Sequence, residues 1–427
     1  MIRMRLAPET DYRELELLKQ RAEADWTAVD LRVREILSDV RRRGDDALRD
    51  WTQRLDGFRP DGFRVGPEAL QEAWAETPAD LQAILREAAE RIRRFHSLQQ
   101  ERSWTTEAEP GVSLGQRVTP LDRVGIYVPG GKAAYPSTVL MNVIPAQVAG
   151  VGEIALFTPA DQEGRVNSLV LAAAQLLGVT EVYRLGGAQA VGAMAYGTAT
   201  IRGVDKITGP GNAYVARAKR EVFGLVGIDM IAGPSEVLVV ADATADAAWI
   251  AADLLAQAEH DEMAAAVLVT PAPALIDAVE AALTEQLSRL PRAGIAAAAL
   301  ERYGCLIQTD TLAQALEVAN RLAPEHLELM VADPWQALRQ VRHAGAVFLG
   351  AHTPEALGDY LAGPNHTLPT SGTARFASPL GVYDFVKRTS ILQFDAAASS
   401  ALSDSVSRLA RAEGLTAHAR SAEMRHL

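Results

Sequence analysis

Residues 123–158 read RVGIYVPGGKAAYPSTVLMNVIPAQVAGVGEIALFT, and the architecture can be predicted outward from them. The runs VGIYV and EIALF have the length of buried strands, and the helix-length apolar segment STVLMNVIPAQVAG lies between them. A strand, a helix and a second strand in this order form a βαβ unit, whose two strands are parallel. We therefore predict a parallel sheet with helices packed on its faces.

The same pattern continues along the chain in two series. The first series adds a helix around VNSLVLAAAQLLG, the strand EVYRLG, a short helix and DKITG. The second starts at EVLVVAD and continues with a helix over 246–260, AAVLVTP, helices to about Arg302, GCLIQTD, LELMV and AVFLG. The predicted fold class is α/β, with two parallel-sheet units that could be diverged copies of one plan.

The two ends of the chain have a different pattern. Val33, Ile36, Leu37 and Val40 repeat at helical spacing before Gly44, and a second helix is predicted to open at Thr77. Residues 363–379 have the composition of a loop, and the remainder is predicted to be a short strand followed by a helix and a polar tail. This tail is too small to form its own core, so it must pack on a larger body, which could be a second subunit.

Composition limits the classes of function. The 427 residues exceed one ordinary domain, and the formal net charge of −12 argues against a nucleic-acid or anionic-membrane partner. The single cysteine, Cys305, excludes an intramolecular disulfide and fits a reducing compartment. No stretch has the pattern of a signal peptide or the roughly 20 apolar residues of a membrane helix, so we expect a cytoplasmic protein.

Four glycine-containing segments adjoin predicted strands. Glycine lets the backbone approach a ligand closely, and helix N-termini attract anions. Tight-turn chemistry explains any one of these segments, but four in one unit favour a bound cofactor, although none has the GxGxxG spacing. The segments are VPGG (128–131), LGGAQA (185–190), TGPGN (208–212) and AGPSE (232–236).

Scattered nitrogen and oxygen donors are candidates for a metal site. Gln257 and His260 are three residues apart on one predicted helix face, Asp359 follows a strand, and His418 lies in the tail. Such a mixed donor set suits zinc or a similar divalent metal and leaves coordination open for a substrate. Spacing alone is a weak argument, because a polar pair at a helix end is more often a cap or a surface group.

The pair Glu325–His326 precedes an apolar run and offers two proton-transfer groups of different pKa. An isolated Glu–His pair is more often an exposed turn. Cys305, in contrast, lies in the apolar run YGCLIQ and is expected to be buried rather than nucleophilic. If this chain oxidises an aldehyde, the reaction should therefore proceed through hydrated substrate and not through a thioester.

Taken together, these segments resemble the histidinol dehydrogenase family along nearly the whole chain. The longest matching stretches are VGIYVPGGKAAYPSTVLMNVIPAQVAG, RLGGAQAVGAMAYGT, VDKITGPGNAYVARAKR, IDMIAGPSEVLVVAD and PEALGDYLAGPNHTLPT, with DLLAQAEH, PEHLEL, AGAVFLG and GLTAH between and after them. Their length and their order in the chain argue against chance similarity.

The resemblance implies roles for individual residues. The NAD-binding positions are Tyr127, Gln189 and Asn212. The ligands of one zinc ion per subunit are Gln257, His260, Asp359 and His418. The substrate contacts are Ser235, Gln257, His260, His326, Asp359, Glu413 and His418, and the catalytic pair is Glu325 with His326.

The resemblance also implies an activity and an organisation. The expected reaction is the four-electron oxidation of L-histidinol, through L-histidinaldehyde, to L-histidine with two NAD, at the end of histidine biosynthesis. The expected fold has a helical segment at 1–22, one Rossmann-like domain formed by 23–123 with 235–380, and a second, NAD-binding one inserted at 124–234. Residues 381–427 would form an arm that carries Glu413 and His418 to the partner's site in a homodimer.

Three alternatives remain at this stage. The chain could be a relative within this family that uses zinc and NAD to oxidise another polar alcohol. A zinc hydrolase could use Glu325 to activate water, although it would have no need of the glycine segments or the NAD positions. A non-catalytic binding protein would leave the Glu325–His326 pair without a role.

Overall fold

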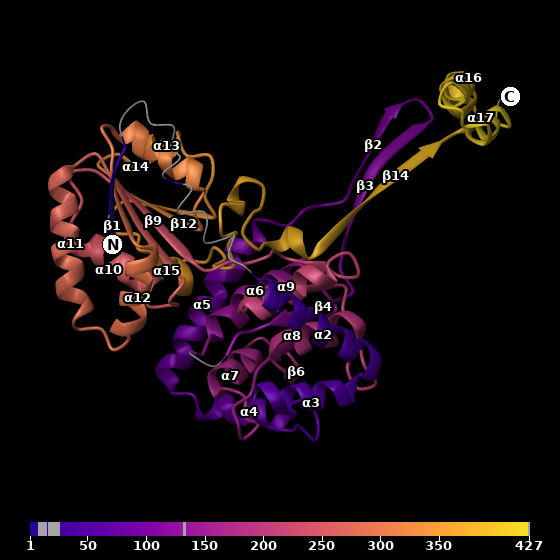
Figure 1. Ribbon diagram of the computed structural model, residues 1–427. Coiled ribbons are helices and arrows are strands. Elements are labelled where there is room, and N and C mark those ends of the chain that lie inside the picture. Colours follow the sequence, from indigo (N-terminus) through magenta and orange to yellow (C-terminus); the bar gives the residue numbers. More distant parts are fainter. Residues whose placement is uncertain (7–14, 16–25, 131–133, 426–427) are drawn as a thin grey trace.

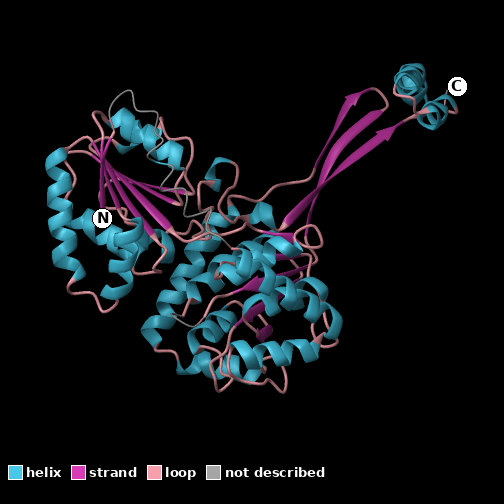
Figure 2. Ribbon diagram, viewed as in Figure 1, coloured by secondary structure: helices cyan, strands magenta, loops and turns pink. Residues whose placement is uncertain are grey.

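The structure, a computed structural model, describes residues 1–6, 15, 26–130 and 134–425. Two lobes, each built around its own sheet, lie side by side, and an extended arm projects from the body and carries the C-terminus at its tip (Figures 1 and 2). Both lobe sheets consist of parallel strands, which confirms the predicted α/β class. Within the described residues, none of the helices is long and apolar enough to span a membrane.

The first lobe contains the stretch from which the fold was predicted. Its five strands are parallel and lie in the order β6-β5-β4-β7-β8, so the chain reverses direction across the sheet between β4 and β7. The strands are β4 (Arg123–Tyr127), β5 (Glu153–Thr158), β6 (Glu181–Arg184), β7 (Lys206–Thr208) and β8 (Gly227–Ile228); the connecting helices are α6 (Pro136–Ala149), α7 (Ser168–Leu176), α8 (Gly187–Tyr196) and α9 (Ala213–Val222).

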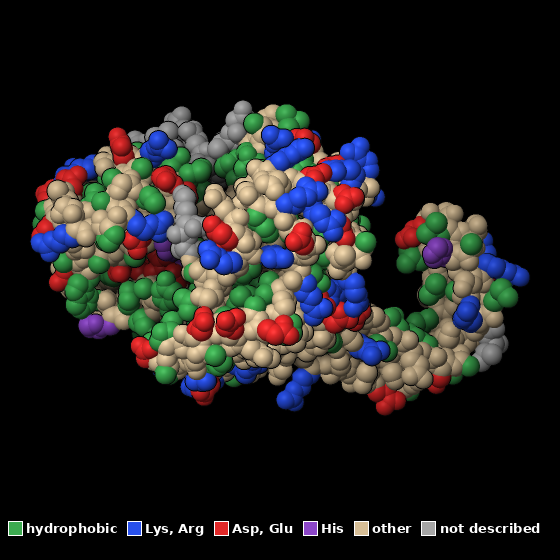
Figure 3. All heavy atoms as spheres, turned by 90° about the horizontal axis from the view of Figure 1, so that it is seen from below, with side chains coloured by type: hydrophobic (Ala, Val, Ile, Leu, Met, Phe, Trp, Pro, Cys, Tyr) green, Lys and Arg blue, Asp and Glu red, His purple; other side chains and the backbone are tan. Residues whose placement is uncertain are grey.

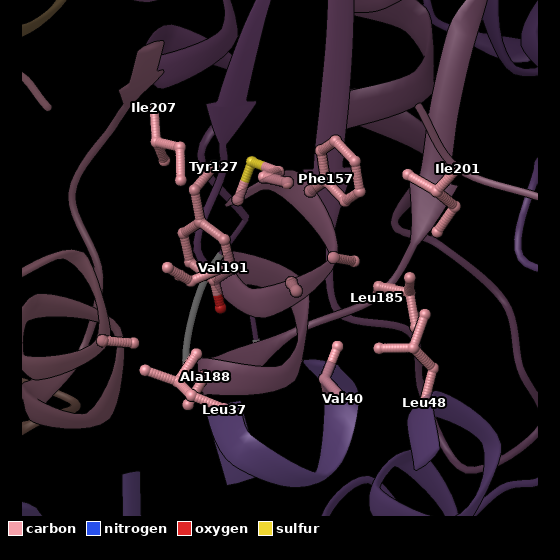
Figure 4. Packing of buried hydrophobic residues seen from close by; sticks show 14 of the residues in the cluster. Leu37, Val40, Leu48, Tyr127, Phe157, Leu185, Ala188, Val191, Ile201 and Ile207 are labelled. Atoms are coloured by element: carbon pink, nitrogen blue, oxygen red, sulfur yellow. The ribbon is translucent and has the colours of Figure 1, made fainter. Parts of the chain in front are cut away.

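The N-terminal helices complete this same lobe. One face of the sheet packs against α2 (Thr27–Arg43) and α3 (Asp45–Leu55), where Leu37, Val40 and Leu48 contact a core that contains Tyr127 and Phe157 (Figure 4). The opposite face packs against α4 (Pro67–Glu76) and α5 (Ala79–Ser97). Alternate strand residues point to opposite faces, so each strand contributes to both cores.

This packing corrects the expected assignment of residues 23–123. They were expected to join 235–380 in one domain, but the helices from Thr27 to Ser97 bury their apolar faces on the other lobe. The pattern at Val33, Ile36, Leu37 and Val40 revealed a buried helix face, but periodicity does not specify which sheet covers it.

The second lobe repeats the strand order of the first. Its strands lie in the order β1-β11-β10-β9-β12-β13, again with a reversal at the first strand of the series, β9. The strands are β1 (Ile2–Arg5), β9 (Glu236–Ala241), β10 (Ala265–Thr270), β11 (Cys305–Gln308), β12 (His326–Met330) and β13 (Ala346–Leu349). Helices α10 (Ala247–Ala258), α11 (Pro273–Leu287) and α12 (Ala293–Tyr303) cover one face, and α13 (Leu312–Leu322) and α14 (Pro334–Leu338) cover the other.

The N-terminal segment 1–22 was expected to be helical. Residues Ile2–Arg5 instead form the edge strand β1, which pairs in parallel with β11. The alternation of arginine with apolar residues in IRMR suits a strand at the edge of a sheet. Residues 7–14 and 16–22 of the expected segment lie outside the described residues.

The arm is a three-stranded antiparallel ribbon with a helical tip. Its central strand, β3 (Val112–Pro120), pairs along its whole length with β14 (Val386–Phe394) and on its other side with β2 (Trp104–Glu109). Two helices, α16 (Ala396–Ala412) and α17 (Thr416–Glu423), pack on each other at the end of this ribbon (Figure 1). The predicted strand and helix of the tail are confirmed, whereas the β2–β3 hairpin was not predicted.

Candidate active site

The residues expected to act in chemistry gather where the second lobe faces the first. His326 is the first residue of β12, Gln257 and His260 lie at the C-terminal end of α10, and Asp359 lies in the short helix α15 (Glu355–Tyr360). All of these positions lie at the amino edge of the sheet, the edge where its strands begin. Carboxylate and histidine side chains are visible in a hollow on this lobe (Figure 3).

His326 is held with one ring nitrogen directed into the protein. Its Nδ1 lies 3.1 Å from the backbone carbonyl of Glu236, which only a protonated nitrogen can contact favourably. Nε2 is therefore the acceptor, and it is buried without a hydrogen-bond partner among the described residues. Burial lowers the pKa of His326 to about 4, against an opposing effect of the Asp359 charge. The ring is neutral at pH 7 and can accept a proton at Nε2.

Glu325 is fixed next to this ring by the neighbouring strand. Its Oε2 accepts a hydrogen bond of 2.9 Å from the backbone N–H of Glu236 and lies 3.7 Å from Nδ1 of His326. Glu325 and His326 are only 6% and 4% exposed, so the pair is not the exposed turn that an isolated Glu–His would form.

Two further residues of the site were not singled out in the sequence. Oε1 of Glu355 lies 3.7 Å from Nδ1 of His326, and burial raises the pKa of Glu355 well above its usual value. His366 contacts the backbone carbonyl of Asp359 through Nδ1, at 3.0 Å, and burial lowers its pKa. His366 lies in the loop-like stretch 363–379 and Glu355 precedes that stretch, and no local pattern gave a reason to choose either residue.

Gln257 and His260 are neighbours, and Asp359 acts on the same two histidines as His260. Nε2 of Gln257 lies 3.4 Å from Nδ1 of His260, and the charges of His260 and Asp359 both act on His326 and His366. Oε1 of the fully buried Gln257 has no partner among the described residues, although a buried amide oxygen normally has one. An unsatisfied oxygen beside an imidazole and a carboxylate fits a divalent cation.

A second donor set overlaps the first. His326, Glu355 and Asp359 each place one ligand atom within 4.8 Å of the others, so this group could also hold a metal ion. Nδ1 of His326 already donates to a carbonyl, which leaves Nε2 as the ring atom free to bind a metal ion. Asp359 is common to this set and to the set with Gln257 and His260.

The structure does not bring Glu413 and His418 to this space within one chain. Glu413 follows α16 and His418 lies in α17, and both are exposed at the tip of the arm, away from the lobes (Figure 1). Ser235, by contrast, immediately precedes β9, and its carbonyl accepts the N–H of Ala265. The segment AGPSE therefore leads into a strand at the amino edge of its sheet, whereas the other three glycine-containing segments follow strands.

The three expected NAD-binding positions all follow strands of the first lobe. Tyr127 ends β4, Gln189 lies in the first turn of α8 after β6, and Asn212 caps α9 after β7. The hydroxyl of Tyr127 accepts the backbone N–H of Gly187 at 3.0 Å, and Asn212 is exposed. Oε1 of Gln189 is buried without a partner among the described residues. These positions surround the point where the strand order reverses, which is where open α/β sheets bind ligands. Gly131 of the VPGG segment lies outside the described residues.

Gly209 shows why the TGPGN segment requires glycine. Its φ of +106° is accessible to glycine, and a Cβ atom there would lie 2.0 Å from the carbonyl oxygen of Tyr127. Asp229 accepts the Gly209 N–H at 2.7 Å, and Lys219 donates to the Gly209 carbonyl at 3.0 Å. Lys219 and Asp229 also form a buried ion pair with each other, which fixes the two side chains that bond to Gly209.

Contacts between the lobes connect the two sets of residues. Oγ1 of Thr138, in the first turn of α6, lies 3.3 Å from Nε2 of His366. Nearby, Asn365 donates to the carbonyl of Met141. The carboxyl edge of the first sheet therefore faces the amino edge of the second. The second lobe carries an acid–base pair and donor atoms suited to a metal ion, and the first lobe carries turns suited to a dinucleotide. This arrangement defines a two-lobed α/β enzyme.

Comparison with known proteins identifies the family. Residues 19–426 match the family described as histidinol dehydrogenase. The chain is 57% identical over 401 residues to the histidinol dehydrogenase of Chromobacterium violaceum, which covers 93% of this chain and 92% of that protein. It is 55% identical to that of Geobacillus kaustophilus, over 92% of this chain and 93% of the relative. A crystal structure of histidinol dehydrogenase from Elizabethkingia anophelis superposes with a TM-score of 0.93 at 36% identity, covering 100% of this chain and 98% of that one.

The chain therefore belongs to the histidinol dehydrogenase family, the NAD-dependent oxidoreductases of histidine biosynthesis. This membership does not favour the three alternatives, namely a relative that oxidises another polar alcohol, a zinc hydrolase and a non-catalytic binding protein.

Proposed function

We propose that this protein oxidises L-histidinol through L-histidinaldehyde to L-histidine, with NAD as the hydride acceptor in both steps. The observation that carries the proposal is the convergence of Glu325, His326, His260, Gln257 and Asp359 on one space, opposite the turns after β4, β6 and β7. Family relatives bear the name of this activity.

The proposed metal is one zinc ion per subunit. Gln257, through its unsatisfied Oε1, His260 and Asp359 would hold it, with His418 of the partner subunit as the fourth ligand. Bound zinc would supply a template for the nitrogen atoms of the substrate, so that the carbinol carbon lies near the hydride acceptor. The C-terminal end of α10 favours a cation at this position, because helix carbonyls converge there.

His326 is the proposed general base. Its Nε2 has a free lone pair, and the carbonyl of Glu236 fixes the tautomer that leaves it free. The pKa of about 4 keeps the ring neutral at pH 7, so its capacity as a base is lost only as the pH falls through about 4. Nε2 would take the hydroxyl proton of the alcohol, and later that of the hydrated aldehyde, as hydride leaves the same carbon.

Glu325 is the proposed group that activates water. The aldehyde must be hydrated before a second hydride can leave, and a carboxylate beside the base can take a proton from the attacking water. Cys305 has no part in this step. It is buried in β11, where burial raises its pKa to about 12 and so suppresses the thiolate.

The remaining substrate contacts are proposed on the resemblance. Ser235 lies at the same edge as His326, and Glu413 and His418 would come from the partner subunit. Tyr127, Gln189 and Asn212 would contact NAD, as their positions at the strand ends of the first lobe support. We also propose a cytoplasmic location, on the basis of the free, buried Cys305.

A homodimer with exchanged arms is proposed from the shape of the arm. The arm exposes Trp104, Leu392, Leu409 and other apolar side chains, and a ribbon of three strands does not bury such residues by itself. A second copy of the chain would cover them, and it would bring His418 to a site that one chain leaves incomplete (Figure 1).

The activity is tested by the stoichiometry of NADH formation. We expect two NADH for each L-histidinol consumed, and loss of turnover after treatment with a chelator that is reversed by added zinc. Release of product without NAD, or full turnover after zinc removal confirmed by metal analysis, would contradict the proposal.

The exchanged arm is tested by mixing two inactive variants, His326→Asn and His418→Asn. In a mixed dimer, one site combines an intact body with an intact arm from the other subunit. Random exchange of subunits then restores about a quarter of the wild-type activity. An inactive mixture, with mixed dimers confirmed by mass spectrometry, would mean that each arm serves its own body.

A further inference from the structure

A single residue of β9 holds both members of the Glu325–His326 pair through its backbone. The N–H of Glu236 donates to Oε2 of Glu325 at 2.9 Å, and the carbonyl of Glu236 accepts from Nδ1 of His326 at 3.1 Å. A displacement of Glu236 would therefore break one of these bonds or move both side chains. The relative position of the acid and the base depends on where the backbone of Glu236 lies.

The side chain of Glu236 points away from the imidazole. Val237 and His326 are register partners in β9 and β12, so their side chains lie on the same face of the sheet, the face that α10 covers. Glu236 precedes Val237, so its side chain is on the opposite face, which α13 and α14 cover. The route from this carboxylate to the pair is therefore the backbone of Glu236.

A loop that is distant in the sequence anchors this side chain. Oε1 of Glu236 accepts the backbone N–H of Ser371 at 2.8 Å, and Oγ1 of Thr370 accepts the N–H of Gly233 at 2.6 Å. The two bonds run in opposite directions between the same two segments. Together they join the start of β9 to residues 370–371.

The conformation of this loop shows that its contact with β9 is closely specified. Ser371 has a φ of +56°, which is unfavourable for a residue with a side chain and persists only where its surroundings hold it. A Cβ atom on Gly233 would lie 2.4 Å from Oγ of Ser371, so the two segments are in close contact. The carbonyl of Thr370, which is 2% exposed, is in turn bound by the hydroxyl of Thr373 at 2.7 Å.

We propose that Glu236 is a positioning residue for the catalytic pair, held in place by the bond between its carboxylate and the N–H of Ser371. This bond fixes the first residue of β9, whose backbone then presents Glu325 and His326 at one spacing. A general base must be placed within a fraction of an ångström of its productive position, so a support of this kind affects the rate. The role rests on the proposed function of the pair, and it requires no contact between Glu236 and the substrate.

Two substitutions of the same residue separate the bond from the charge. Glu236→Ala removes the acceptor of the Ser371 N–H, whereas Glu236→Gln retains an acceptor oxygen and removes only the charge. Asp242→Ala is the matched control, because Asp242 follows the other end of β9 and its Oδ2 accepts the backbone N–H of Ala332 at 2.8 Å. The control removes a bond of the same kind at the edge of the sheet away from the pair.

We expect kcat of Glu236→Ala to fall about 10- to 100-fold, with the KM for L-histidinol and the zinc content unchanged. The isotope effect on kcat with L-histidinol deuterated at the carbinol carbon should increase, because hydride transfer beside a misplaced base becomes the slow step. Glu236→Gln should keep kcat within about threefold of the wild type. The control should match the wild type in kcat and in the isotope effect, although its melting temperature should fall.

Wild-type kcat in Glu236→Ala, or an equal loss in Glu236→Gln, would overturn the proposal. A lower kcat with an unchanged isotope effect would also overturn it, because partial unfolding lowers the amount of active protein without changing its slow step. If Glu236→Ala does not fold, Thr370→Val decides by the same two measurements, since it removes the neighbouring bond to Gly233 and keeps Glu236. Failure of the proposed function is distinct, because the wild-type protein and the Asp242→Ala control would then form no NADH from L-histidinol.

Discussion

The two lobes have the same strand order but use opposite edges of their sheets. In the first lobe, β6-β5-β4-β7-β8, the expected NAD-binding residues follow the strands at the carboxyl edge. In the second lobe, β11-β10-β9-β12-β13, His326 begins a strand and His260 follows the end of a helix, both at the amino edge. The same plan therefore presents two chemically different surfaces.

The difference follows from the direction of the backbone dipoles. At the carboxyl edge of a parallel sheet the helices begin, and their free N–H groups suit the phosphates of a dinucleotide. At the amino edge the helices end, and their carbonyl groups suit a cation. Placing one edge against the other brings a site for an anionic cofactor next to a site for a metal ion.

The largest expected effect is at the amino edge. Replacement of His326 by Asn removes the proton acceptor at Nε2, and we expect kcat to fall roughly 100- to 10,000-fold. Metal content and NAD affinity should be retained, because His326 is not among the proposed ligands of either. His352→Asn, at an exposed histidine of the same lobe, is the control. Wild-type kcat in His326→Asn would refute its role as the base.

A smaller effect is expected at the carboxyl edge. Gly209→Ala places a Cβ against the carbonyl of Tyr127 at a positive φ, which displaces the turn next to Asn212. We expect the KM for NAD to rise about tenfold, with metal content unchanged. Gly178→Ala is a matched control, because Gly178 also has a positive φ but a Cβ atom added there would meet open space. Equal effects of the two substitutions would mean that general strain, and not the cofactor turn, causes the loss.

The smallest effect is expected for Cys305→Ala. Cys305 begins β11 but is buried away from the proposed site, so kcat should stay within about twofold of the wild type in both oxidation steps. The free energy of unfolding should decrease by about 1 kcal/mol, from the lost packing. Selective loss of aldehyde oxidation would point to a thioester and contradict the proposed role of hydrated substrate.

Part of this site was predictable from local sequence. The βαβ pattern predicted both parallel sheets, and the spacing of Gln257 and His260 on one helix face brought them together. The buried position of Cys305 followed from its apolar run. Glu355 and His366 could not be predicted, because their importance depends on contacts with His326 and Asp359 from other parts of the chain.

The sequence by itself determined the strands and helices of the two βαβ series, because apolar periodicity and glycine turns are local and set each element before it packs, but it did not determine β1 or the β2–β3 hairpin. It also determined the family, through long matching segments in one order. Only the tertiary structure decided that the N-terminal helices cover the first sheet, that the two sheets meet by opposite edges, and that the arm carries His418 away from its own body. These features depend on which apolar faces bury one another, and many pairings of faces are compatible with the same local pattern.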